Sequence, residues 1–234
     1  MVAKKEHSTD EIAELICQLW QPLSPEEQQM VKSHICVKKI RKNDILYKQF
    51  DTPQMLMCLI YGKVKVYKDG VGGRLQIIRA IKPVEMFGYR AFFAQQNYQT
   101  SAVALEPSIV ALFPLAVLSR LMSTSLSVNQ YFVRQLSAML GASDERTVSL
   151  TQKHIRGRLA EALLFLRDNY GLEPDGYTLS IYLSREDLAS LSNMTTSNAI
   201  RTLSAFANER IIAIDGRKIK IINEAQLNKI SSMG

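Results

Sequence analysis

Cysteine is scarce in this chain of 234 residues, and no two cysteines form a CxxC pair. Cys17, Cys36 and Cys58 are odd in number and widely spaced. A disulfide framework or a cysteine-ligated metal cluster needs more thiols at closer spacing. The sequence therefore predicts buried, reduced thiols and no iron–sulfur cluster. The three histidines are equally isolated, and they leave the use of haem or another redox group undecided.

Long apolar runs and catalytic patterns are also missing. No stretch approaches the roughly 20 apolar residues of a membrane helix. The polar start, Met1–Asp10, lacks the apolar region of a secretory leader, so we expect a cytoplasmic protein. Acidic residues are scattered, and no nucleophile–base pair, metal cluster or phosphate loop is visible. We therefore do not expect an enzyme.

The composition contains enough hydrophobic residues to form hydrophobic cores, and it has an excess of positive charge. Hydrophobic residues make up 47% of the chain, and the formal net charge is +7. A positive balance favours an anionic partner without identifying it.

The N-terminal half changes from a helical to a strand pattern. Residues from Ser8 to Ser33 have helical spacing, with a second helix start at Ser24. Short strands with turn signals follow, and Gly62 and Gly88 lie where tight bends are expected. The strands are expected at 37–40, 45–48, 55–67, 75–81, 102–105 and 109–113. Many short strands at close spacing predict an antiparallel β-roll of the jelly-roll kind.

A long helix is expected after Pro114, with an apolar stripe along one side. Such a stripe needs a surface to cover it, and a second copy of the chain is an economical one. The sequence thus predicts a homodimer, although the stripe could instead pack on its own barrel. The predicted dimer residues are Leu118, Leu121, Met122, Phe132, Leu136, Met139 and Leu140.

Residues 183–203 have the pattern of a helix-turn-helix. Ser184 is a natural N-cap with Asp187 three residues later. Ser192-Asn193 interrupts the apolar face, and Asn tolerates the left-handed turn conformation. Thr195 begins a second helix, whose apolar side is expected to be Ala199, Ile200, Leu203 and Phe206. A helix-turn-helix places the N-terminal end of its second helix in the major groove of DNA.

A hairpin pattern, Ile211–Ile222, follows directly, with a turn signal at Asp215-Gly216. Arg217, Lys218 and Lys220 put positive charge at and after its tip, as in the wing of a winged helix. The predicted partner is double-stranded DNA; the alternatives are a purely structural role or a winged helix that binds protein. The predicted DNA contacts are Ser184, Arg185, Thr195, Thr196, Ser197, Asn198, Arg201, Arg217 and Lys218.

The predicted architecture is thus α+β in three parts. Residues 1–114 form the helices and β-roll, residues 115–152 form the long helix and hinge, and residues 153–234 form the winged helix. The hinge is expected near Lys153-His154.

This order of elements resembles the CRP/FNR superfamily of bacterial transcription regulators, over nearly the whole chain. The motifs that carry the resemblance are Tyr61–Val64, Phe87-Gly88, Gly157–Ala160 and the winged helix. The sequence looks most like the branch found in Bacteroidetes. The resemblance implies a homodimer on a palindromic operator, a cyclic-nucleotide-type sensor domain and contact with RNA polymerase. Activation and repression are both open.

The family's cyclic-AMP cassette runs from a Gly-Glu pair to an Arg-Ser/Thr pair, and the matching stretch here is Gly88–Thr100. Tyr89 stands at the ribose-binding Glu position and Gln99 at the phosphate-binding Arg position. Loss of that Arg removes the charge-assisted bonds of a phosphate site, so cyclic AMP is not expected and the effector is unknown. The implied effector pocket contains Gly88, Tyr89, Arg90, Gln99, Thr100, Ser143 and Asp144.

The family's recognition-helix residues Arg, Glu and Arg match Thr196, Ser197 and Arg201. Only the last is retained, so the preferred operator is expected to differ from the best-known one.

Overall fold

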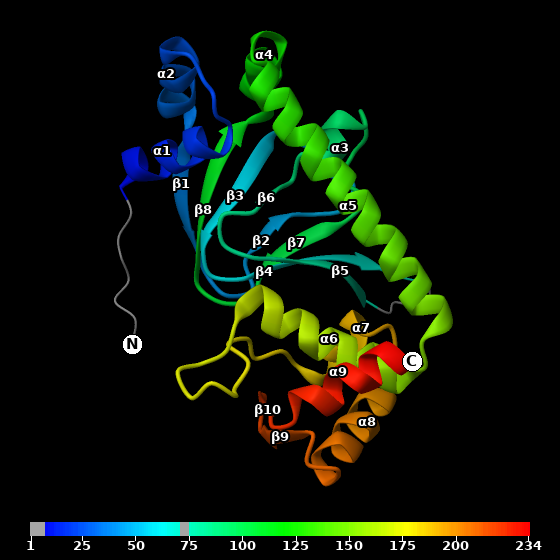
Figure 1. The fold of residues 1–234 in the computed structure, drawn as a ribbon. Coiled ribbons are helices and arrows are strands. Elements are labelled where there is room, and N and C mark those ends of the chain that lie inside the picture. Colours follow the sequence, from blue (N-terminus) through cyan, green and yellow to red (C-terminus); the bar gives the residue numbers. More distant parts are fainter. Residues whose placement is uncertain (1–7, 71–74) are drawn as a thin grey trace. The chain divides into compact units, whose positions relative to one another are not determined.

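The structure is a computed structural model that describes residues 8–70 and 75–234, and it forms two compact units (Figure 1). The first comprises Met1–Lys68 and Arg79–Leu140, and the second Asp69–Ile78 and Gly141–Gly234. Antiparallel sheets, a long helix and a C-terminal helix-turn-helix confirm the α+β fold. The three-part division with a hinge near Lys153 stays a prediction. Within the described ranges, no helix is long and apolar enough to cross a membrane.

Two capped helices open the first unit, α1 (Thr9–Leu19) and α2 (Pro25–His34). Ser8 Oγ accepts the backbone N–H of Glu11, and the Glu11 carboxylate accepts the backbone N–H of Ser8. Ser24 and Glu27 repeat this reciprocal arrangement in α2. Each pair satisfies two N–H groups that the helix backbone leaves free, which confirms both helix starts.

Within residues 8–70 and 75–114, eight strands build two four-stranded sheets in the orders β1-β8-β3-β6 and β2-β7-β4-β5. The short helix α3 (Arg90–Phe93) follows β6. The strands are β1 (Cys36–Ile40), β2 (Ile45–Tyr47), β3 (Met55–Tyr61), β4 (Val64–Asp69), β5 (Leu75–Ile81), β6 (Met86–Phe87), β7 (Ser101–Ala104) and β8 (Ser108–Pro114).

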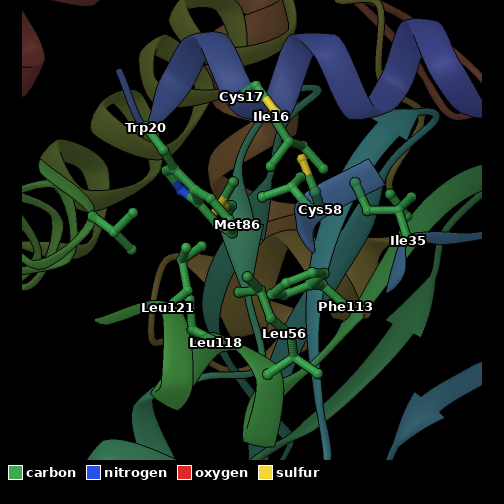
Figure 2. Packing of buried hydrophobic residues seen from close by; sticks show 14 of the residues in the cluster. Ile16, Cys17, Trp20, Ile35, Leu56, Cys58, Met86, Phe113, Leu118 and Leu121 are labelled. Atoms are coloured by element: carbon green, nitrogen blue, oxygen red, sulfur yellow. The ribbon is translucent and has the colours of Figure 1, made fainter. Parts of the chain in front are cut away.

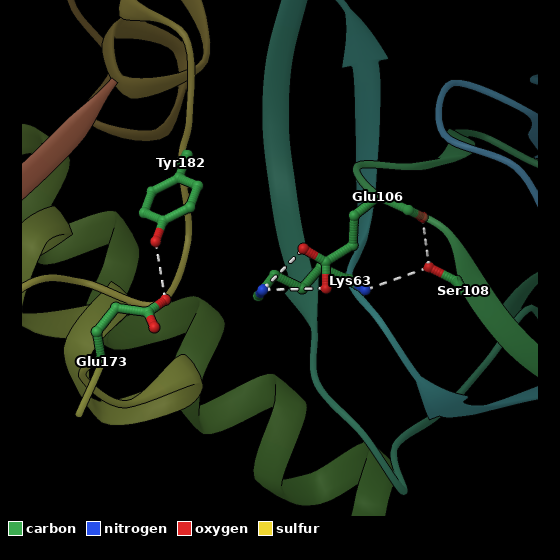
Figure 3. Close-up of polar contacts among 5 residues, drawn as sticks. All are labelled: Lys63, Glu106, Ser108, Glu173 and Tyr182. Carbon is green, nitrogen blue, oxygen red and sulfur yellow. Dashed lines mark hydrogen bonds and ion pairs between the residues drawn. The ribbon is translucent and has the colours of Figure 1, made fainter. Parts of the chain in front are cut away.

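Gly62 divides the single strand expected at 55–67 into β3 and β4. Its φ of +95° is in the left-handed region, and a Cβ there would overlap the Ser108 hydroxyl. That hydroxyl accepts the Lys63 N–H at 3.3 Å, and Lys63 Nζ lies 2.9 Å from the Glu106 carboxylate (Figure 3). The close approach of β8 therefore requires glycine in the motif Tyr61–Val64.

Strand β3 is covered on both faces, because alternate residues point to opposite sides. Leu56, Cys58 and Ile60 join a core with α1, α2 and α4, where Trp20 is completely buried (Figure 2). Met57 and Leu59 face the interior of the roll. The sheet thus separates two apolar clusters.

The prediction of buried cysteines is correct for two of the three. Cys17 and Cys58 are buried, and burial raises the pKa of Cys58 to about 12. Cys36 is exposed, because it opens β1, whose side chains are largely at the surface.

A strained turn precedes β6. Val84 has a φ of +68°, a conformation that disfavours L-residues and a β-branched one most. Pro83 precedes it, and the Glu85 N–H donates to Lys82 O at 3.2 Å. This arrangement corresponds to a turn in which glycine normally follows proline.

We therefore expect Val84→Gly to raise the free energy of unfolding by about 1 kcal/mol, since relief of strain exceeds the added chain entropy. Val148→Gly is the matched control: it removes the same side chain from a helix and should lower stability by about 0.5 kcal/mol. Urea denaturation of both variants measures the difference. Two shifts of the same sign would contradict the assignment of strain to Val84.

The single long helix expected after Pro114 is two helices, α4 (Leu115–Thr124) and α5 (Leu126–Gln152). Ser125 between them is buried and extended. The Asn129 side-chain amide donates to the carbonyl oxygens of Met122 and Ser125. The bond to Met122 gives a partner to a carbonyl at the end of α4, while the Ser125 carbonyl also accepts the Asn129 backbone N–H.

The predicted dimer stripe is largely covered within one chain. Leu118, Leu121 and Phe132 are at most 1% exposed in the core around Trp20, so a partner cannot reach them and their assignment was wrong. Met122, Leu136 and Met139 pack partly against the same core. Leu140 is exposed, together with Leu126 and Val133, which the sequence analysis did not include.

The second unit contains α6 (Ile155–Tyr170), α7 (Arg185–Leu191), α8 (Thr196–Asn208), β9 (Ile212–Asp215), β10 (Lys218–Ile221) and α9 (Glu224–Met233). The sequence analysis missed α9. Gly157 in α6 permits the close approach of this helix, because a Cβ would lie 2.6 Å from the carbonyl carbon of Gly234.

A short piece of β5 is also part of the second unit. Ser190 Oγ accepts the Ile77 N–H and donates to Leu75 O, both at 2.7 Å. The Arg146 guanidinium donates to the carbonyl oxygens of Ile77, Ile78 and Leu191 at 2.9–3.2 Å. Burial lowers the pKa of Arg146, and these three acceptors compensate its desolvation.

Candidate nucleic-acid interface

The two helices of the predicted helix-turn-helix begin where the sequence places them. Ser184 Oγ accepts the Asp187 N–H at 3.0 Å, and Thr195 Oγ1 accepts the Asn198 N–H at 3.2 Å. Asn193 adopts a φ of +49° in the turn, as expected for Asn. Both N-caps and the left-handed turn are confirmed.

The inner sides of α7 and α8 pack together and leave one face of α8 free. Ala199, Leu203 and Phe206 are buried, as predicted. Ile200 is 46% exposed, so its assignment to the apolar side was wrong: it lies on the same face as Thr196 and Ser197, three to four residues earlier.

The first turns of α8 present the predicted base-reading residues. Thr195, Ser197 and Arg201 are exposed, and Thr196 and Asn198 are half-buried. Arg201 Nη2 donates to Asn198 Oδ1 at 2.5 Å, so the arginine has a neutral partner. The sequence analysis did not foresee this pair.

The hairpin β9–β10 forms the predicted wing, with register Asp215↔Lys218. The loop is therefore Gly216-Arg217, one residue later than expected, and Gly216 supplies the φ of +56°. Arg185 Nη2 donates to Gly216 O at 2.8 Å, which ties the start of α7 to the wing tip. The sequence analysis had assigned Arg185 to DNA only.

Lys218 lies beside an aromatic ring. Its Nζ is 6.0 Å from the centroid of Tyr182, and the Tyr182 hydroxyl donates to Glu173 at 2.9 Å (Figure 3). A cation over an aromatic face is attracted without losing its charge. Lys218 therefore remains available to an anion.

A cavity of about 360 Å³ lies where the two helix starts meet the wing. It gathers predicted DNA contacts from three separate segments of the chain. Its lining residues are Ser184, Arg185, Glu186, Thr196, Gly216 and Arg217.

The charges around this surface fall into two groups. Arg156 forms two 2.7 Å bonds with Glu209, and Lys220 lies 3.4 Å from Asp175. Hydrogen bonds from Thr178 and Tyr177 hold the pKa of Asp175 well below its usual range. Among residues 8–70 and 75–234, no carboxylate pairs with Arg201, Arg217 or Lys218. The cations that carboxylates compensate, Arg156 and Lys220, are thus different residues from the predicted DNA contacts.

The Gly88–Thr100 stretch is filled by its own aromatic residues. Tyr89 is 1% exposed, its ring packs 5.0 Å from that of Phe132, and its hydroxyl donates to Met139 Sδ at 3.5 Å. Burial raises the pKa of Tyr89, so a neutral phenol occupies the position of the family's ribose-binding carboxylate. The Tyr89 side chain belongs to the core, and its part in an effector pocket stays a prediction.

The other positions of the predicted pocket offer little to a phosphate. The Tyr98 ring stacks on Tyr47 at 3.9 Å and its hydroxyl donates to Gly88 O. Tyr47 and Thr100 share a hydrogen bond. The exposed Gln99 donates to Asn97 O, and Arg90 is also exposed. Ser143 and Asp144 are exposed in the second unit, and their part in a pocket stays a prediction.

We expect no saturable binding of cyclic AMP at micromolar concentrations. The ribose position is a buried phenol, and the phosphate position is an uncharged amide that bonds to its neighbour. Isothermal titration calorimetry measures this directly, with a cyclic-AMP-binding relative as positive control. One bound cyclic AMP per subunit with micromolar affinity would overturn the expectation.

A helix-turn-helix with a basic wing, attached to a β-roll through a long helix, defines a DNA-binding transcription regulator. Residues 37–125 match the cyclic nucleotide-binding domain, and residues 157–230 match the Crp-like helix-turn-helix domain. The chain belongs to the CRP/FNR superfamily, which comprises transcription regulators rather than enzymes. Its placement in a Bacteroidetes branch stays a prediction.

Curated relatives match along most of the chain. The cyclic AMP receptor protein of Thermus thermophilus is 26% identical over 217 residues, covering 91% of this chain and 96% of the relative. The fumarate and nitrate reduction regulatory protein of Vibrio cholerae is 26% identical over 199 residues, covering 84% and 78%. The solved structure of FixK2 from Bradyrhizobium japonicum superposes with a TM-score of 0.75 at 21% identity, covering 84% and 96%.

Proposed function

We propose that this protein is a homodimeric transcription regulator that binds a palindromic operator in the cytoplasm and contacts RNA polymerase. α8 enters the major groove, and the wing contacts phosphates. Arg201 carries this proposal: it is exposed on the free face of α8, and among the residues that the structure describes no carboxylate compensates its charge. Ile200 beside it offers an apolar contact for a thymine methyl group.

The proposed dimer forms through the exposed side of α5. Leu126, Val133 and Leu140 are 71%, 62% and 65% exposed. Their seven-residue spacing puts them along one line of the helix, the pattern of a coiled-coil seam. A second α5 covers these side chains and holds two winged helices for two half-sites.

The effector that we propose for the sensor domain is not cyclic AMP. The stacked Tyr47 and Tyr98 and the buried Tyr89 support a sensor domain that takes a less anionic effector or none.

Fluorescence anisotropy with duplexes selected from a random pool tests the DNA-binding proposal. The expected result is enrichment of a palindrome, with affinity that falls steeply as salt rises, because bound cations displace counterions from phosphates. Absence of binding at low salt would instead favour a winged helix that contacts protein.

A further inference from the structure

The orientation of Arg201 is set by Asn198, one helical turn before it. The 2.5 Å bond from Arg201 Nη2 to Asn198 Oδ1 joins residues three apart, which lie on the same face of a helix. Asn198 is itself held, because its backbone N–H donates to the N-cap hydroxyl of Thr195. A chain of two hydrogen bonds therefore connects the start of α8 to the guanidinium.

A neutral partner has a different consequence from a carboxylate. Glu209 accepts two bonds from Arg156 and compensates its charge. Asn198 accepts one hydrogen bond from Arg201, so the positive charge and the other N–H donors of the guanidinium remain available to a ligand. A long side chain loses much rotamer freedom on binding, and holding it beforehand reduces that loss.

We propose that Asn198 is a positioning residue that presents Arg201 to one guanine of the operator, an inference that rests on the proposed function. The competing assignment is that Asn198 reads adenine itself, through Oδ1 and its amide group. That contact uses the oxygen that Arg201 already engages, so the geometry favours positioning.

The test compares selected duplexes for the wild-type chain, Asn198→Ala, Arg201→Ala and the double variant. Asn198→Ala should weaken binding roughly two- to tenfold, the size of one hydrogen bond, and relax preference at the operator position that Arg201→Ala relaxes. The double variant should bind no worse than Arg201→Ala alone, because the two residues act as one unit. For Asn198→Ala alone, the dependence of affinity on salt should match that of the wild-type chain, since this variant loses no charge.

Asn198→Asp serves as the matched control, because it keeps an acceptor at the same place and adds a negative charge. It should retain the guanine preference of the wild-type chain while weakening binding to every duplex. Thermal melting of all variants excludes loss of folding as the cause.

Two outcomes would overturn the inference in distinguishable ways. If Asn198→Ala changes a position that Arg201→Ala leaves intact, Asn198 reads a base directly and the proposed function stands. If the wild-type chain enriches no duplex, the proposed function fails and this inference fails with it.

Discussion

Arg201→Ala is expected to cost about 1–3 kcal/mol per half-site and to relax base preference at one operator position. A guanidinium donates two parallel bonds to O6 and N7 of guanine, a paired acceptor that no other base presents. In a symmetric dimer the loss applies at both half-sites. Duplex selection followed by affinity measurement determines the position and the size of the change.

Lys218→Ala is the matched control, since it removes one cation from the wing. Lys218 lies near the wing tip, with its Nζ 6.0 Å from the centroid of the Tyr182 ring, so we expect it to meet phosphate. Its loss should weaken binding to all sequences and make the salt dependence shallower.

The prediction for Arg201 has a clear contradiction. If the wild-type chain and Arg201→Ala enrich the same half-site with the same guanine, Arg201 does not read a base.

Val133→Asp combined with Leu140→Asp is expected to yield monomers. Both side chains are exposed in the single chain, so the charges should leave the roll folded while opposing burial in a dimer. Loss of the second half-site should weaken DNA binding by about 10² or more. Light scattering reports the mass, and anisotropy reports the affinity.

Ala138→Asp is the control on the same helix. It is exposed and lies about 140° around the helix from Val133, so it should remain dimeric. A double variant that stays dimeric would refute the placement of the seam.

The local elements of the DNA interface could be predicted from sequence because short-range chemistry determines them. Ser184 and Thr195 cap their helices through residues three positions later, and Asn193 accepts the turn conformation. Such signals need no knowledge of distant parts of the chain. The wing was displaced by one residue, since both Asp215-Gly216 and Gly216-Arg217 place glycine in the loop.

The long-range relations could not be predicted in the same way. Helical spacing showed that Phe132 is on an apolar face, but it could not show whether a partner or the chain's own core covers that face. The match to the family's cyclic-AMP cassette showed that Tyr89 stands where the family has a carboxylate. Only the structure shows that the Tyr89 ring packs against Phe132 in the core. At the break between α4 and α5, the Asn129 side chain bonds to carbonyl oxygens on both sides, which no periodic pattern indicates.

The polypeptide passes between its two compact units at three places, after Lys68, after Ile78 and after Leu140. The unit with the helix-turn-helix is therefore discontinuous in sequence, and no single cut of the backbone releases it whole. A fragment that starts at Gly141 lacks the β5 carbonyl oxygens that accept hydrogen bonds from Ser190 and Arg146. In that fragment, the Ser190 hydroxyl and the Arg146 guanidinium must donate to water instead. The stability and DNA binding of such a fragment would then reflect the missing β5 segment as much as the missing β-roll. A variant of the DNA-binding unit alone must therefore keep residues 69–78, joined to it by an engineered connection, and cannot be made by truncation.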